Sequence, residues 1–277
     1  MPALPKTRSA LPAERRILIA TDFSENAMRA ARYAMDLFGT QNTTYTLLHA
    51  YLYMGIVGPN MPIMDLPGID DAEAALRLFG RHLSAGKGKL KLKVEIGSLP
   101  TVIDEFAAKH NVDLVVMGHQ GVTGLAFMGG STTAVIKQCN VPVLAVPDTA
   151  LEGPVRRIVL LSDHGELLPG VLAPLRDIAL RTGAEVSITH VAEDAKPPVR
   201  HWSDPVLELQ LKDVNYGFRI LAGTDVLEVM ERITKEEKVD LIAVLHRKRD
   251  LLGSLFHSST AKRLVMHGRV PLLVLGQ

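Results

Sequence analysis

The sequence predicts an α/β protein of two tandem doubly wound domains, each a mostly parallel five-stranded sheet flanked by helices. Two observations carry this prediction. Four segments of the first half recur in the same order in the second half. Within each copy, short apolar runs alternate with helical stretches, which is typical of β-α-β units with right-handed crossovers. A length of 277 residues suits two domains of about 130 residues each.

The repeat is visible as four matched pairs of segments. The offset between copies is 141 residues for the first two pairs and then 127 and 129, so the copies differ in length between these matches. The pairs are RRILIATD with RRIVLLSD, TLLHAY with SITHVA, VDLVVMGH with VDLIAVLH, and VPVLAVP with VPLLVLG. A fixed order of repeated segments indicates a duplicated domain.

The domain limits follow from this repeat. PDTALEGP has a proline at each end and is typical of a linker. The N-terminus lacks the apolar stretch of a signal peptide, and we expect a mobile tail there. The predicted division is a tail at 1–14, a first domain at 15–148, a linker at 149–154 and a second domain at 155–277.

The elements of the first copy follow one another at short intervals. Its strands are short and rich in β-branched residues or leucine, as expected of strands buried on both faces. They are ILIA, TYTLLHA, LKVEIG, DLVVM and PVLAV. Between the first two, Ser24 to Phe38 places four alanines and a leucine on one stripe, with Ser24 as the N-cap. A second helix is predicted at Leu99 to His110, with its copy at Val226 to Lys235.

Composition excludes several classes of protein. Lys+Arg is 31 against Asp+Glu 30, so the net charge of +1 does not support nucleic-acid or membrane-surface binding by the whole chain. The uncharged stretches 37–64 and 114–136 are broken by turn-forming residues and are not expected to span a membrane. Cys139 is the single cysteine, which suits a reducing cytoplasm, and we expect it in the core.

The stretch GHQGVTGLAFMGGSTTAVI (118–136) contains five glycines and no charge. It begins at the end of a predicted strand, and Ser131 begins a predicted helix. A helix N-terminus after a glycine loop binds anions through free backbone N–H groups. The stretch contains neither GxxxxGK[ST] nor GxGxxG. A phosphate-binding loop and a flexible structural loop both remain open from these residues.

Several of these motifs resemble the universal stress protein family. They are ILIATDFS, VDLVVMGHQGVTGL, GGSTTAVI and NVPVLAVP, and the resemblance covers the chain as two copies. In the nucleotide-binding branch of the family the loop reads Gly, two residues, Gly, nine residues, Gly, then Ser or Thr. Gly118 and Gly121 match the first pair, and Gly130 with Ser131 matches the last. Eight residues lie between, so the loop is one residue short.

The resemblance implies a stress-response regulatory protein that binds ATP, with Mg²⁺, in the first domain. Asp22 would meet the adenosine through a ribose hydroxyl; its alternative is a turn or cap residue beside Ser24. The phosphates would be held by a set whose alternative role is turn geometry and helix capping: Gly118, Gly121, Gly130, Ser131 and Thr132. Because the loop is short, a nucleotide-free scaffold for an unknown protein partner is the alternative function.

The second copy lacks these glycines. We interpret His246 as standing where Gly118 stood and Arg249 as replacing Gly121, so no nucleotide is expected there. Five basic residues nearby form either a solvated face or an anion or partner site: Arg247, Lys248, Arg249, Lys262 and Arg263. The family resemblance also implies that 141–147 and 270–276 pair edge to edge as a pseudo-dimer, and it leaves a homodimer open.

No catalytic residue or metal site is predicted. The loop contains no lysine, so turnover would be a slow ATPase activity at most. His246, His257 and His267 are too widely spaced for the short ligand pairs of a zinc site. His49 and His190 are equivalent in the two copies and are expected to hydrogen-bond locally. The methionine-rich stretch 51–69 either covers the cleft or packs on a partner, or it fills a groove of its own domain.

Overall fold

The computed structural model describes residues 14–52, 68–83, 89–119, 130–150, 153–162, 165–193, 205–246 and 270–276. Several predictions therefore concern residues outside the described part. These are the N-terminal tail up to residue 13, most of the stretch 51–69, Gly121, and the five basic residues of the second copy.

The first half is a five-stranded parallel sheet in the order β3-β2-β1-β4-β5. Both helices predicted from the sequence are present there, Ser24 is the N-cap of the first, and the core position of Cys139 is confirmed. The elements are β1 (Arg15–Ala20), α1 (Glu25–Phe38), β2 (Thr43–Tyr51), α2 (Ile69–Leu83), β3 (Lys89–Ile96), α3 (Leu99–His110), β4 (Leu114–His119), α4 (Gly130–Gln138) and β5 (Val143–Pro147).

The second half repeats this arrangement in the order β10-β9-β6-β7-β8, and within this half every pair of neighbouring strands is parallel. Its elements are β6 (Arg157–Leu161), α5 (Ala173–Thr182), β7 (Glu185–Ala192), α6 (Pro205–Gln210), β8 (Tyr216–Ala222), α7 (Val226–Glu237), β9 (Leu241–His246) and β10 (Leu272–Gly276). The helix predicted at Val226 to Lys235 extends two residues further than expected.

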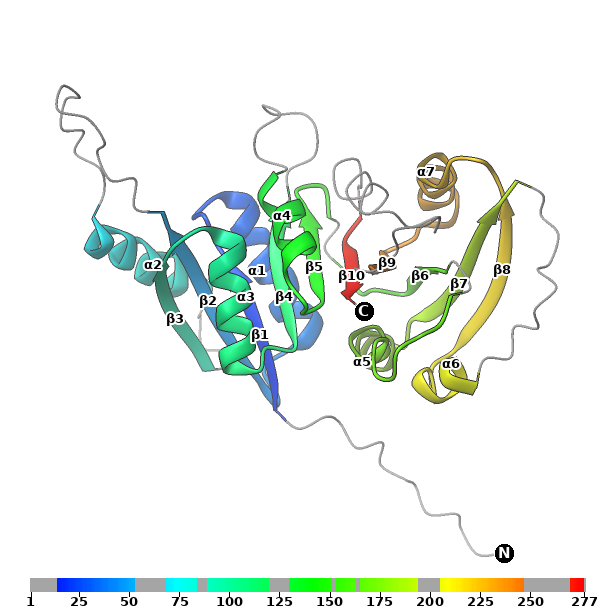
Figure 1. The fold of residues 1–277 in the computed structure, drawn as a ribbon, viewed down its shortest axis with the longest axis horizontal. Coiled ribbons are helices and arrows are strands. Elements are labelled where there is room, and N and C mark those ends of the chain that lie inside the picture. Colours follow the sequence, from blue (N-terminus) through cyan, green and yellow to red (C-terminus); the bar gives the residue numbers. More distant parts are fainter. Residues whose placement is uncertain are drawn as a thin grey trace, which may run out of the picture.

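The two halves join through their last strands. β5 and β10 pair antiparallel, with Leu272 opposite Ala145 and Val274 opposite Val143, so one ten-stranded sheet runs through the molecule (Figure 1). The predicted edge-to-edge pseudo-dimer is therefore confirmed. Burying these two edges also protects apolar strands that would otherwise be free to pair with other chains.

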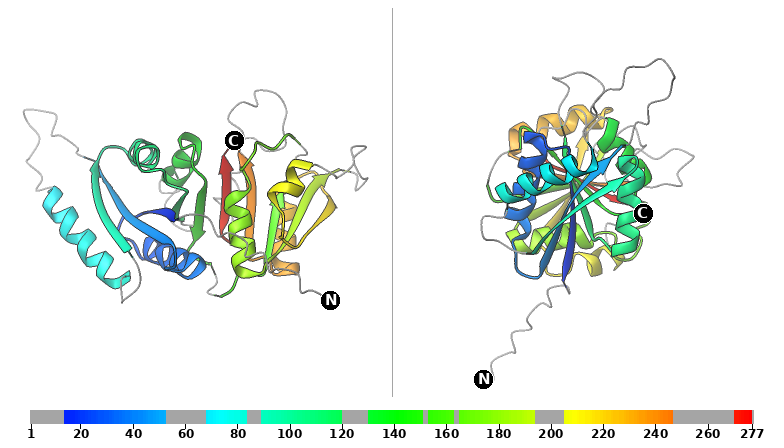
Figure 2. Two further views of the ribbon diagram at one scale, coloured as in Figure 1. Left: turned by 90° about the horizontal axis from the view of Figure 1, so that it is seen from below. Right: turned by 90° about the vertical axis from the view of Figure 1, so that its left-hand side faces the viewer.

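Helices cover both faces of the sheet and create two apolar layers. In the first half, α1 and α2 lie on one face and α3 and α4 on the other (Figure 2). Side chains of α5 join the layer of α1 and α2, whereas side chains of α7 join the layer of α3 and α4. Within the described part of the chain, no helix is long and apolar enough to cross a membrane.

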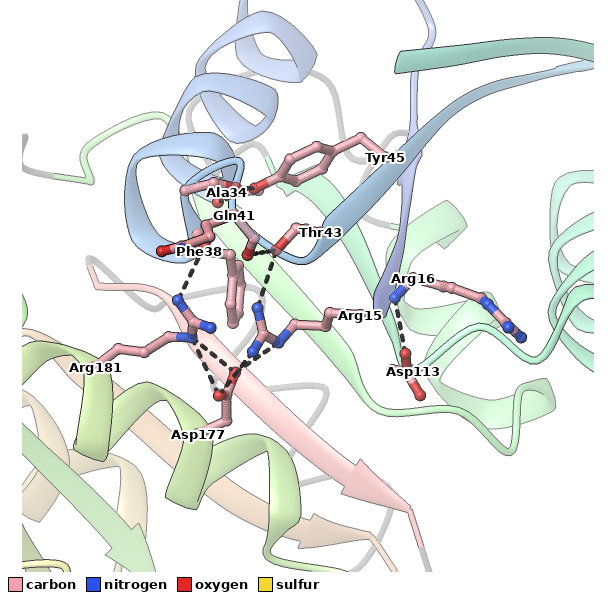
Figure 3. A network of polar contacts seen from close by, with 11 residues as sticks. Arg15, Arg16, Ala34, Phe38, Gln41, Thr43, Tyr45, Asp113, Asp177 and Arg181 are labelled. Atoms are coloured by element: carbon pink, nitrogen blue, oxygen red, sulfur yellow. Dashed lines mark hydrogen bonds and ion pairs between the residues drawn. The ribbon is translucent and has the colours of Figure 1, made fainter. Parts of the chain in front are cut away.

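A buried ion pair ties the halves together beside the strand joint. Nε of Arg15, at the start of β1, lies 2.9 Å from Oδ2 of Asp177 on α5 (Figure 3). Arg181 donates through Nε to the same carboxylate at 3.1 Å and through Nη1 to the carbonyl of Phe38 at 3.2 Å. The Arg15 side chain is only 6% exposed, and the Asp177 carboxylate compensates its positive charge.

Candidate functional site

The first helix of the chain begins at the carboxyl end of β1 with a polar turn. Ser24 Oγ accepts a hydrogen bond from the Ala27 N–H at 3.1 Å, which caps α1. Asp22 Oδ1 accepts from the Ser24 N–H at 3.0 Å. The turn role considered for Asp22 is therefore real, and it uses one carboxylate oxygen.

Beside this turn lies a cavity of about 280 Å³, called here the first cavity. It opens at the carboxyl ends of β1, β2 and β4, where ligands bind in parallel α/β sheets. Four of the six residues predicted to bind nucleotide line it: Asp22, Gly118, Ser131 and Thr132. Gly130 is the first residue of α4, and Gly121 lies outside the described residues.

Two helix N-termini meet at the first cavity. Ser24 and Asn26, at the start of α1, line one side of it, and Ser131 and Thr132, in the first turn of α4, line another. The first turn of a helix has unpaired N–H groups and a partial positive charge, which stabilises a nearby anion. Thr132 is buried and donates weakly through Oγ1 to the Gly118 carbonyl at 3.4 Å, whereas Ser131 is exposed.

Gly118 has a packing role that the sequence did not reveal. A Cβ at this position would lie 2.9 Å from the backbone carbonyl carbon and oxygen of Asn26 and 3.0 Å from the Ala27 nitrogen. The absence of a side chain therefore lets α1 approach the end of β4. This close approach alone explains a glycine here, so Gly118 by itself is not evidence for a ligand.

Two polar side chains, Asn26 on α1 and His119 at the end of β4, are buried without partners among the described residues. Asn26 lines the cavity and is 6% exposed, and its Oδ1 accepts no hydrogen bond from any described residue. His119 is 3% exposed, and neither ring nitrogen has a described partner. Burial lowers the pKa of His119, although the nearby Asp148 carboxylate partly offsets this. Such groups are costly unless a water or a ligand satisfies them.

His49 contributes a ring to the wall of the first cavity. Its Nδ1 lies 2.8 Å from the Thr21 carbonyl oxygen, and its ring stacks on Phe23 with centroids 4.3 Å apart. Because a carbonyl only accepts, Nδ1 carries the proton, and Nε2 of the neutral ring is an acceptor. His190 makes the equivalent bond to Ser162 at 2.9 Å, so local bonding by both histidines is confirmed.

The strand register corrects our alignment of the second copy. Ile17 in β1 pairs with Leu114 in β4, and its repeat Ile158 in β6 pairs with Leu241 in β9. Counting from these pairs, Leu245 occupies the position of Gly118, and His246 that of His119. The expectation that His246 replaces Gly118 was therefore wrong by one residue. The repeated segments VDLVVMGH and VDLIAVLH, at their offset of 127 residues, already place Leu245 opposite Gly118, and the register agrees with them.

Leu245 changes what the second half can hold at this position. Its side chain is 3% exposed and fills the strand end where the first half has only a glycine hydrogen. Asp163, the repeat of Asp22, lies outside the described residues. Among the described residues, no group of three or more His, Cys, Asp or Glu side chains could hold a metal ion.

Comparison with known sequences decides the family. The universal stress protein family matches residues 14–147 and again residues 154–276. The chain belongs to the universal stress protein family. It is a tandem member, because the two matches follow each other along one chain.

Individual universal stress proteins are similar to parts or most of this chain. One from Methanocaldococcus jannaschii is 30% identical over 145 residues, which cover 48% of this chain and 81% of that protein. The crystal structure of one from Archaeoglobus fulgidus covers 95% of this chain and 98% of its own, with a TM-score of 0.72 and 18% identity. The latter shows a shared tandem fold. A universal stress protein solved in complex with cAMP covers 49% of this chain and 98% of its own, with 20% identity and a TM-score of 0.38.

Proposed function

We propose that this protein is a stress-response regulator that binds one adenine nucleotide, ATP, in the first cavity and none in its second half. The observation that carries the proposal is the meeting of two helix N-termini, those of α1 and α4, at one polar cavity. Backbone N–H groups aimed at one point hold phosphate without a lysine, which suits a loop that contains none.

Several described lining residues have a definite part in this proposal. Ser131 offers its hydroxyl and backbone N–H to the phosphates and Thr132 its backbone N–H, because the Thr132 hydroxyl already donates to the Gly118 carbonyl. Mg²⁺ would be bound by the phosphates themselves. Asp22 keeps one carboxylate oxygen for a ribose hydroxyl while the other accepts from Ser24. The adenosine would lie between His49 and Leu99, which also line the first cavity. Binding would order the glycine segment and change the surface offered to a partner protein.

Ser131→Ala tests the proposal with little risk to the fold, because Ser131 is exposed. We expect isothermal titration of the wild-type chain with Mg-ATP to give one site per chain. The variant should bind at least about tenfold more weakly, because a hydrogen bond to a charged group contributes about 1.5–3 kcal/mol. Ser98→Ala is the matched control: Ser98 precedes α3, makes no side-chain cap, and does not line the first cavity.

A second measurement separates this function from the nucleotide-free scaffold. Protein purified under native conditions and then denatured should release adenine nucleotide in up to equimolar amount, identified by mass spectrometry. If no nucleotide is released and millimolar Mg-ATP leaves the melting temperature unchanged, the scaffold is the correct function. Binding of two nucleotides per chain would contradict the proposal that the second half binds none.

A further inference from the structure

A second cavity, of about 570 Å³, lies between the two halves and is called here the interdomain cavity. Its walls are the outer turns of α1, the connection between β5 and β6, and the end of α5. We propose that the interdomain cavity binds a small, multiply charged oxyanion and so links the two halves. Its volume lies within the range of about 300–1,000 Å³ that is usual for small-molecule sites.

The charge of the walls favours an anion. Three arginines line the interdomain cavity: Arg29 and Arg32 from α1 and Arg181 from α5. Asp36 is the one acidic residue among its described lining residues. Arg32 is exposed and makes no hydrogen bond or ion pair with any described residue, so its charge is available.

The other two arginines are already held in place. Arg29 Nη1 donates to the Asp148 carbonyl at 2.8 Å and its Nη2 lies 3.9 Å from Glu25 Oε2, an exposed pair, and Arg181 is fixed by Asp177 and by the Phe38 carbonyl. A guanidinium has five N–H donors, so each retains several for a ligand. Side chains that are ordered before binding lose little entropy when they bind, and the planar guanidinium matches phosphate and carboxylate oxygens.

Tyr33 adds a neutral donor to the same wall. It lines the interdomain cavity, and its hydroxyl is buried without a partner among the described residues. Burial raises the pKa of Tyr33, so the phenol stays protonated and able to donate. A buried hydroxyl without a partner is unfavourable, and an oxyanion in the cavity would satisfy it.

Apolar residues complete the walls, including Leu37, Val146 and Val155. They reduce the exposure of a bound anion to water and strengthen its attraction to the arginines. Because Arg32 belongs to α1 and Arg181 to α5, one ligand would contact both halves. Ligand binding should therefore resist separation of the halves, independently of any nucleotide in the first cavity.

The test uses inorganic pyrophosphate and citrate as separate probes in isothermal titrations at constant ionic strength. We expect at least one of them to saturate a site on the wild-type chain. Arg32→Gln should weaken that binding about tenfold or more, the usual scale for a charge-assisted bond. Tyr33→Phe should weaken it about threefold. Arg77→Gln, an exposed helical arginine of α2 that does not line the cavity, should change nothing.

The first cavity must be separated from this site, because pyrophosphate also resembles the phosphates of ATP. Gly130→Val, at the start of α4, should leave the Arg32-dependent binding unchanged. Saturation by pyrophosphate alone indicates a phosphate-bearing ligand, and saturation by citrate alone a polycarboxylate. The proposal fails if neither probe saturates, or if binding survives Arg32→Gln and is lost in Gly130→Val.

Discussion

The two halves have the same strand order but differ at the carboxyl end of their sheets. The first half has Gly118 at the end of β4, and the second has the buried Leu245 at that position. α1 has 14 residues before its C-cap Gly39, whereas α5 has 10 before Gly183. α5 begins twelve residues after the last residue of β6, whereas α1 begins five residues after the last residue of β1.

These two differences belong together. In the first half, the glycine lets the first turn of α1 lie against the strand end, and Ser24 and Asn26 of that turn line the first cavity. In the second half, α5 begins seven residues later relative to the preceding strand and has no side-chain cap, and a leucine occupies the strand end. A glycine with an early helix start thus accompanies the cavity, and a leucine with a late helix start accompanies the filled strand end.

The largest expected effect concerns the contact between α5 and β1, because Asp177 on the shorter helix pairs with Arg15 of the other half. Asp177→Ala would leave Arg15 buried without its carboxylate. Breaking a buried pair in this way costs about 3–5 kcal/mol. We expect the free energy of unfolding in urea to fall by that amount.

The matched control replaces both partners. Arg15→Met with Asp177→Leu removes both charges and keeps apolar volume, so its unfolding free energy should be much closer to that of the wild type. If Asp177→Ala costs less than about 1 kcal/mol, the pair behaves as a solvent-exposed one, and the short helix is not fixed by its link to β1.

A change at Gly118 tests the packing difference directly. Gly118→Ala places a Cβ within 3 Å of the α1 backbone, which cannot move as a flexible side chain would. Overpacking of this kind costs about 1–3 kcal/mol in unfolding free energy. Gly217→Ala in β8 is the control, because a Cβ there meets nothing within 4 Å and should be neutral or slightly stabilising. Equal effects of both changes would show that α1 tolerates a side chain at Gly118.

The sequence was sufficient for the architecture because the repeat and the strand pattern are local signals. It predicted α3 at its observed limits and the Ser24 cap, whereas the pairing of the last strands was implied by the family resemblance. It also gave equivalent roles to His49 and His190, because the offset of 141 residues is constant over the first two strands.

The features that the sequence missed depend on contacts between distant segments. No sequence motif singled out Asn26, and only the fold shows it buried beside the first cavity. Arg15 and Asp177 are 162 residues apart, and no motif connects them. The position of Leu245 was available from the offset of 127 residues between VDLVVMGH and VDLIAVLH, and strand pairing confirms it.

The smallest expected effect concerns the cap that the second half lacks at its corresponding helix. Ser24→Ala removes the hydrogen bond from the Ala27 N–H and should lower the unfolding free energy by about 1 kcal/mol, measured in urea without nucleotide. Ser98 precedes α3 and makes no side-chain cap bond. We therefore expect Ser98→Ala to change the free energy of unfolding by no more than about 0.5 kcal/mol. If the two variants are equally stable, the polar start of α1 does not serve to stabilise that helix. The position of the first turn of α1 beside the first cavity would then depend on the packing of Gly118 against Asn26.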